Sequence, residues 1–208
     1  MPVAGQRRCH DVAVVRGPFV TGLPDKTTSA SAEEICALHE ARVRAELRRA
    51  DTLAPGSDAV TWRGALLAQV AVVKGLPGPA EASGGGAVSG ADGEAVVKAL
   101  AALGYAEGDV FFTLSRQQPD ADDARVTTRL RAQIEAVDPS LILALDAVAA
   151  ADVAAAFGMD RPAWGREVRV LGRRLVAVNG LEASLADPAR KRTVWEQLKA
   201  ARIPGPVY

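Results

Sequence analysis

The sequence predicts a three-layer α/β/α fold with a mostly parallel, four-stranded central sheet. Apolar runs rich in β-branched or aliphatic residues, such as Val70 to Val73 and Leu141 to Leu145, stop at turn residues, which is typical of buried strands in a parallel sheet. Segments with apolar residues at helical spacing separate these runs. Because strands alternate with helices along the chain, we expect helices on both faces of the sheet.

The first expected helix begins after a polar linker at residues 27–31, and residues 11–23 before it predict an extended arm or edge strand. Ser31 and Glu34 have the spacing of a capping box, in which each side chain binds the backbone N–H of the other residue. The helix should run to about Ala50. Along one side of it lie Ile35, Leu38, Val43 and Leu47, and its other faces carry Arg42, Arg44, Arg48 and Arg49.

The first strand of the sheet, residues 69–74, ends in the turn Gly75-Leu76-Pro77-Gly78. The Gly-rich residues 79–90 are expected to form a loop, and they lack the spacing of a phosphate-binding motif. The elements that follow are helix 92–103, strand 110–114, helix 122–137, strand 141–145, helix 147–157, strands 167–171 and 174–178, and helix 187–201. Asp187 and Pro188 are typical of a helix start.

A length of 208 residues fits one domain with an N-terminal extension. We expect residues 1–62 to form an arm and a helix packed on the core, and residues 63–208 to form the α/β domain. The formal net charge is zero, but residues 161–208 carry 10 basic and 4 acidic side chains. Only this part offers the basic surface typical of nucleic-acid binders. Solvated charge without a partner is the alternative.

The two cysteines, Cys9 and Cys36, cannot complete an all-cysteine zinc or iron–sulfur site. They could form one disulfide, but the start of the chain lacks the apolar core of a secretory signal. We therefore expect a cytoplasmic protein with reduced thiols. No apolar run approaches the ~18 residues of a membrane span.

Several segments between residues 63 and 201 resemble the uracil-DNA glycosylase superfamily, most closely its bacterial iron–sulfur branch (family 4). The turn 74–78 stands where that family carries GEAPG, and residues 89–93 stand where it carries FVG-x-AG. Residues 133–145 are similar to its QI…P-x-x-I-x-x-LG segment, and residues 183–199 to its closing motif and last helix. The resemblance implies a base-flipping fold that excises uracil from DNA.

The motif positions that would carry this chemistry hold other residues. The position of the water-activating side chain is Gly75, and the position of the uracil-reading Asn is Leu114. The closing His falls on Gly180, after Asn179, and the stacking aromatic falls near Ala87 or Val88. No cysteine lies in the matched region, so the iron–sulfur cluster of the family is predicted to be absent.

Three polar residues remain near the expected carboxyl edge: Asp146, Asn179 and Glu182. A carboxylate there could serve as a general base, whereas a helix cap at Asp146 and a solvated charge at Glu182 are the simpler interpretation. The candidate phosphate-binding residues are Arg173, Arg174, Arg190, Lys191 and Arg192.

These observations predict a glycosylase-like protein that has lost uracil excision and retains at most weak DNA or partner binding. An active glycosylase or hydrolase that uses Asp146, Asn179 or Glu182 is the first alternative. The second is a structural or protein-interaction module, with a homo-oligomer among the options.

Overall fold

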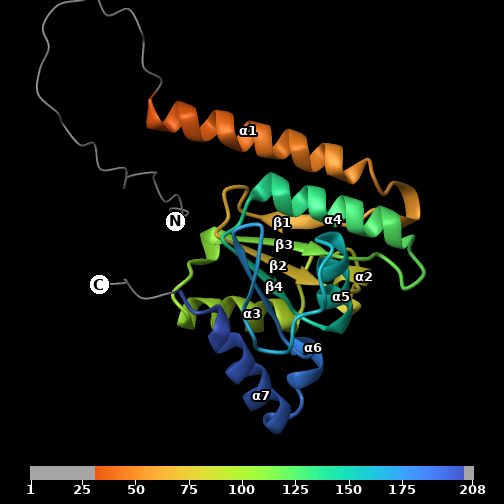
Figure 1. Cartoon of the computed structure of the whole chain (residues 1–208), viewed down its shortest axis with the longest axis vertical. Helices are drawn as coiled ribbons and strands as arrows, with labels where there is room; N and C mark the ends of the chain where they lie inside the picture. The colour runs from red at the N-terminus through yellow and green to blue at the C-terminus, as the bar shows by residue number, and fades with distance from the viewer. Residues whose placement is uncertain (1–30, 204–208) are drawn as a thin grey trace, which may run out of the picture.

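The computed structural model describes residues 31–203, which form an α/β fold around one six-stranded mixed sheet (Figure 1). The strand order is β1-β3-β2-β4-β6-β5. The strands are β1 (Trp62–Gly64), β2 (Val70–Lys74), β3 (Val110–Leu114), β4 (Leu141–Ala144), β5 (Val168–Val170) and β6 (Arg173–Ala177). The possible edge strand at residues 11–23 and Cys9 lie outside the described residues.

The expected count of four strands is wrong, because the sheet has six. The inner strands β3, β2, β4 and β6 are parallel, while β1 pairs antiparallel with β3 and β5 pairs antiparallel with β6. The strands predicted at residues 167–171 and 174–178 correspond to β5 and β6, which pair with each other. The short β1 was not predicted, because its three residues join the sheet through backbone pairing with β3 and do not form an apolar run.

The helices are α1 (Ala32–Asp51), α2 (Pro79–Ala82), α3 (Ala91–Ala102), α4 (Asp123–Val137), α5 (Ala147–Ala156), α6 (Leu181–Ser184) and α7 (Pro188–Leu198). Short 3₁₀ turns cover Gly56–Asp58, Glu107–Asp109 and Lys199–Ala201. The four-residue helix α2 lies in the segment 79–90 that was expected to be a loop, and α6, of the same length, lies between the strand expected at 174–178 and the helix expected at 187–201. No helix in the described part of the chain combines the length and the apolar character that crossing a membrane requires.

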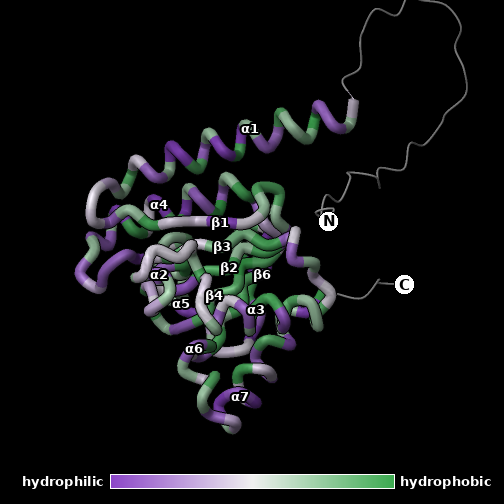
Figure 2. The backbone as a smooth tube through the Cα atoms, turned by 180° about the vertical axis from the view of Figure 1, so that it is seen from behind, coloured by the Kyte–Doolittle hydropathy of each residue, from purple (hydrophilic) through white to green (hydrophobic). Residues whose placement is uncertain are grey.

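Helices pack on both faces of the sheet. Apolar residues of α3, α6 and α7 pack against β2 residues Val70 and Val72 on one face. On the other face, residues of α4 and α5 pack against Val73 and Ile142. Figure 2 shows the hydrophobic strands gathered at the centre, beneath more polar helices.

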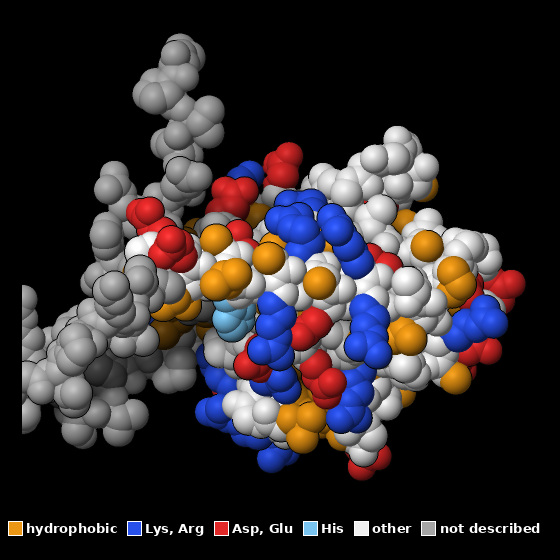
Figure 3. All heavy atoms as spheres, turned by 90° about the horizontal axis from the view of Figure 1, so that it is seen from above, with side chains coloured by type: hydrophobic (Ala, Val, Ile, Leu, Met, Phe, Trp, Pro, Cys, Tyr) orange, Lys and Arg blue, Asp and Glu red, His pale blue; other side chains and the backbone are white. Residues whose placement is uncertain are grey.

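Helix α1 packs on the outside of α4 through its second half only. Val43, Leu47 and Ala50 are buried, whereas Ile35 and Leu38, in the first half of the helix, are 56% and 69% exposed. The predicted capping box of Ser31 and Glu34 is present. Seen from above, acidic side chains are interspersed among the basic ones on this face (Figure 3).

The four inner strands end together at one edge of the sheet. Val73 of β2 aligns with Ala144 of β4, which aligns with Ala177 of β6. Because these strands are parallel, the loops that follow them lie side by side, as is usual for ligand sites in such sheets. The candidate residues Gly75, Asp146, Asn179, Gly180 and Glu182 all follow one of these strands.

Candidate functional site

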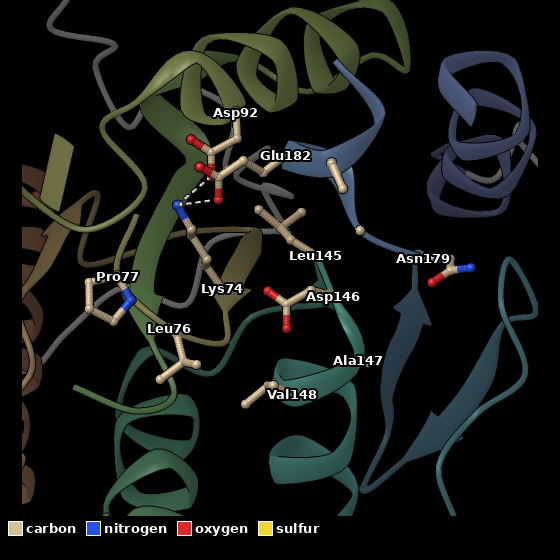
Figure 4. Close-up of a pocket in the computed structure, with 12 residues that line it drawn as sticks. Lys74, Leu76, Pro77, Asp92, Leu145, Asp146, Ala147, Val148, Asn179 and Glu182 are labelled. Carbon is tan, nitrogen blue, oxygen red and sulfur yellow. Dashed lines mark ion pairs between the residues drawn. The ribbon is translucent and has the colours of Figure 1, made fainter. Parts of the chain in front are cut away.

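A cleft of about 520 Å³ lies at this carboxyl edge (Figure 4). Leu76 and Pro77 line it from the loop after β2, and Asp146 and Val148 from the start of α5. The residues that line it from the loop after β6 and from α6 include Asn179, Gly180, Glu182 and Ala183. The structure thus brings together four of the residues singled out in the sequence, around a cleft with several apolar side chains.

A buried lysine at one wall of the cleft pairs with three carboxylates, two of which, Asp92 and Glu182, also line the cleft. The ammonium Nζ of Lys74 lies 2.8 Å from Asp92 Oδ2, 3.2 Å from Glu81 Oε1 and 3.2 Å from Glu182 Oε2. Figure 4 shows Asp92 and Glu182 converging on Lys74 from α3 and α6. We call these four residues the Lys74 cluster. It connects the end of β2 to three different helices.

The charges in the Lys74 cluster stabilise one another. Burial lowers the pKa of Lys74, but the hydrogen bond and charge of Asp92, with help from Glu182 and Glu81, outweigh burial and raise it overall. Burial raises the pKa of Glu81, whereas backbone N–H donors and the Lys74 charge outweigh burial and lower it overall. Glu81 accepts hydrogen bonds from the backbone N–H of Gly78 at 2.9 Å and of Ser89 at 3.2 Å. Lys74 is therefore a protonated cross-link at neutral pH rather than a nucleophilic amine.

The loop after β2 has no room for a side chain at Gly75. The backbone N–H of Gly75 donates to Asp146 Oδ2 at 2.8 Å, and its carbonyl accepts from the hydroxyl of Ser115 at 3.2 Å. A Cβ at position 75 would lie 2.5 Å from Asp146 Oδ1 and 2.6 Å from Val148 Cβ. Residue 75 can therefore carry no water-activating group in this conformation.

Both carboxylate oxygens of Asp146 accept backbone hydrogen bonds. Oδ1 accepts from the N–H of Ala149 at 2.9 Å, which makes Asp146 the N-cap of α5, and Oδ2 accepts from Gly75. Such bonds hold the carboxylate in place. Asp146 therefore organises the edge of the cleft.

The positions expected to read or stack a base belong to the core. Leu114, Ala87 and Val88 are all buried in the cluster between the sheet and α3. The guanidinium of Arg63 holds the segment at 87–88, because it donates to the carbonyls of Ala87 and Val88 at 2.6 Å each. These backbone contacts preserve the loop without an aromatic ring.

The loop after β6, which we call the closing loop, holds Asn179 and Gly180 and leads into α6. Gly180 has φ 76°, a left-handed conformation that favours glycine over a residue with a Cβ. The backbone N–H of Asn179 donates to Gln197 Oε1 at 2.8 Å. In Figure 4 the Asn179 side chain points away from Lys74 and Asp146. Glu182, in α6, reaches the Lys74 cluster.

The five candidate phosphate-binding residues fall into two groups. Arg173 and Arg174 begin β6, at the edge opposite the cleft. Arg174 is buried and donates to Glu167 Oε2 and to the carbonyls of Ala200 and Arg202. Because its guanidinium is buried and hydrogen-bonded within the protein, Arg174 is not part of a DNA-binding surface. Arg190, Lys191 and Arg192 are exposed on α7, where Arg190 lies 3.5 Å from Asp187.

The sequence interpretation missed three members of the Lys74 cluster: Lys74, Glu81 and Asp92. One signal was present, because a lysine that ends an apolar strand at the carboxyl edge must either reach solvent or find carboxylates. Within residues 31–203 no group of three His, Cys, Asp or Glu side chains has the arrangement of a metal site.

The lining of the cleft is acidic in sum, since Asp92, Asp146 and Glu182 outnumber Lys74. Such a lining repels phosphate groups. Comparison of the chain with models of known protein families gives no match, and neither does comparison with curated protein sequences.

Proposed function

We propose that this chain is a uracil-DNA glycosylase-like α/β protein that has lost uracil excision and acts by binding. In this proposal the sheet with its helices on both faces is the three-layer glycosylase fold, extended by the edge strands β1 and β5. The order of the inner parallel strands and the position of the three loops at their carboxyl edge support it.

The observation that carries the proposal is the closed environment of Gly75. An excising enzyme of this family needs a side chain there to position water, and Asp146 and Val148 fill the space that such a side chain would need. Leu114 in the core and Gly180 in the closing loop remove the two other groups that would read the base or stabilise its anion.

Relocated chemistry is the alternative, and the contacts of its candidate residues weigh against it. Both oxygens of Asp146 accept backbone hydrogen bonds, Asn179 points away from the Lys74 cluster, and Glu182 pairs with Lys74. A general base needs an oxygen that can reach a water beside the substrate. Glu182, whose side chain is half exposed, is the one residue of the three that could provide it.

DNA binding in this proposal is weak and does not use the cleft. The acidic lining disfavours the backbone of a flipped nucleotide, and the exposed cations of α7 lie outside it. We expect a dissociation constant for DNA in the range of non-specific binding, on the order of 10⁻⁵ M at physiological salt. We also propose that the protein binds no iron–sulfur cluster, because residues 63–201 contain no cysteine.

The test is incubation of the purified protein, in excess, with uracil-, hypoxanthine- and abasic-site-containing single and double strands. The account predicts no base release and no strand cleavage, together with a colourless, iron-free preparation. Base release that Glu182→Gln abolishes would establish the relocated-chemistry alternative. Tight DNA binding, with nanomolar affinity at physiological salt, would contradict the proposed role of the acidic cleft.

A further inference from the structure

A second cavity of about 880 Å³ lies between α3 and α7, outside the cleft. Ala95 and Ala99 line it from α3, and Leu185, Val194 and Trp195 line it from the opposite side. Because alanine side chains are short, α3 leaves an open apolar channel beside α7, which we call the α3–α7 groove. Trp195 packs partly against the core and partly borders this groove.

The rim of the α3–α7 groove is basic. Lys98 stands on α3, and Lys191 and Arg192 stand on α7. Lys98 forms an ion pair with Glu94, with 3.7 Å between Nζ and Oε2. In contrast, no carboxylate within residues 31–203 forms an ion pair with Lys191 or Arg192. Both cations lie in the first turns of α7, where the helix dipole disfavours positive charge. An acidic partner would offset this unfavourable placement.

We propose that the α3–α7 groove binds an amphipathic helix of a partner protein, with apolar side chains in the groove and acidic side chains toward Lys98, Lys191 and Arg192. The 12 residues of α3 span about 18 Å, enough for three turns of a bound helix. Helix-in-groove recognition uses an apolar stripe of this kind, and a tryptophan is a frequent anchor in it. The apolar walls offer few groups that could read a nucleic-acid base.

This inference is independent of the loss of uracil excision, because no residue of the groove belongs to the Lys74 cluster or to the loop at Gly75. The class of partner is inferred from the apolar lining and the basic rim of the α3–α7 groove, and not from the glycosylase resemblance. A protein that excises uracil could still use the groove.

The probe is a dye-labelled 18-residue helical peptide with leucines at i, i+3, i+4 and i+7 and glutamates flanking them. A second peptide carries lysines in place of the glutamates. By fluorescence anisotropy at low salt, the wild-type protein should bind the glutamate peptide at least ~10-fold more tightly than the lysine peptide. The double variant Lys191→Glu, Arg192→Glu should reverse that preference.

Two matched variants test the groove itself. Ala99→Phe fills the groove and should abolish peptide binding, whereas Ala101→Phe, on the exposed side of α3, should leave binding unchanged. Circular dichroism establishes that both variants are folded. Absence of binding, equal affinity for both peptides, or equal behaviour of the two Phe variants would overturn the proposal. So would binding to phosphatidylglycerol vesicles, but not to the peptide, that Ala99→Phe abolishes, because the ligand would then be a lipid surface.

Discussion

The backbone N–H of Gly75 donates a 2.8 Å hydrogen bond to Asp146 Oδ2, which joins the loop after β2 to the first turn of α5. The same carboxylate caps α5 through its other oxygen. Residue 75 therefore lies directly against the Asp146 side chain, which also caps α5. The absence of a side chain at position 75 and the position of Asp146 therefore depend on each other.

Replacing Gly75 by alanine should destabilise the protein. The new Cβ would lie within 2.6 Å of Asp146 and Val148, and overpacking of this kind costs about 1–3 kcal/mol. The matched control is Gly108→Ala, because a Cβ at position 108 would have no heavy atom within 4 Å. Urea unfolding measures both variants. Equal midpoints for the two would mean that the loop yields easily, and that an active side chain could be accommodated there.

Lys74→Met should be strongly destabilising at pH 7 because it leaves buried Glu81 and Asp92 without their cation. Breaking a buried ion pair by removing one partner costs about 3–5 kcal/mol. The deficit should shrink as the pH falls toward 4, because the carboxylates of the variant can then take up protons. A deficit that stays constant between pH 7 and 4 would contradict the assignment of the cluster as a charge network.

The Lys74 cluster also predicts how the stability of the unaltered protein depends on pH. The pKa of Glu81 is lowered from 4.5, so its contribution is present above 4.5 and is lost as the pH falls through the lower, folded-state value. The pKa of Lys74 is raised from 10.5, so its contribution is present below 10.5 and is lost as the pH rises through the higher value. The contribution of the Lys74 cluster to the free energy of unfolding should therefore be constant from about pH 5 to 10. Unfolding measurements from pH 3 to 11 test this.

Asp92→Asn and Glu182→Gln should separate the buried part of the cluster from its exposed part. The side chain of Asp92 is 4% exposed and that of Glu182 is 50% exposed. We expect a loss of about 2–3 kcal/mol for Asp92→Asn and of under ~1 kcal/mol for Glu182→Gln. Denaturant unfolding at pH 7 measures both, and a larger loss for Glu182→Gln would show that the wall of the cleft depends on α6 rather than on α3.

Arg174 should contribute to the stability of the fold, whereas Arg192 should contribute to non-specific DNA binding. Arg174→Met removes the donor that binds Glu167 and two backbone carbonyls, and should cost about 3 kcal/mol or more. Arg192→Glu should leave stability within about 0.5 kcal/mol and weaken non-specific DNA binding. The comparison needs thermal unfolding and a DNA titration of both variants. Unchanged DNA affinity in Arg192→Glu would remove α7 from the binding surface.

Local patterns predicted the central elements, and long-range contacts decided the rest. The strand at 141–145 was evident because its residues are continuously apolar and end at Asp146, and β4 is found at Leu141–Ala144. Strand β1 and the exposure of Ile35 and Leu38 depend on what lies opposite each segment in space. The Lys74 cluster joins positions 74, 81, 92 and 182, and no local pattern states that Glu182 meets Lys74. The motif positions Gly75 and Gly180 were found at the cleft edge because the ends of parallel strands share one edge.

The rate of uracil release from single-stranded DNA, with the protein in excess over the strand, tests the central claim most directly. The measurement follows free uracil by mass spectrometry, with an active uracil-DNA glycosylase as the positive control. The account predicts a rate equal to that of the strand alone, because position 75 has no room for a water-activating side chain and Leu114 is buried. Uracil release above that background, if it persists after repurification and is lost in Glu182→Gln, would contradict it.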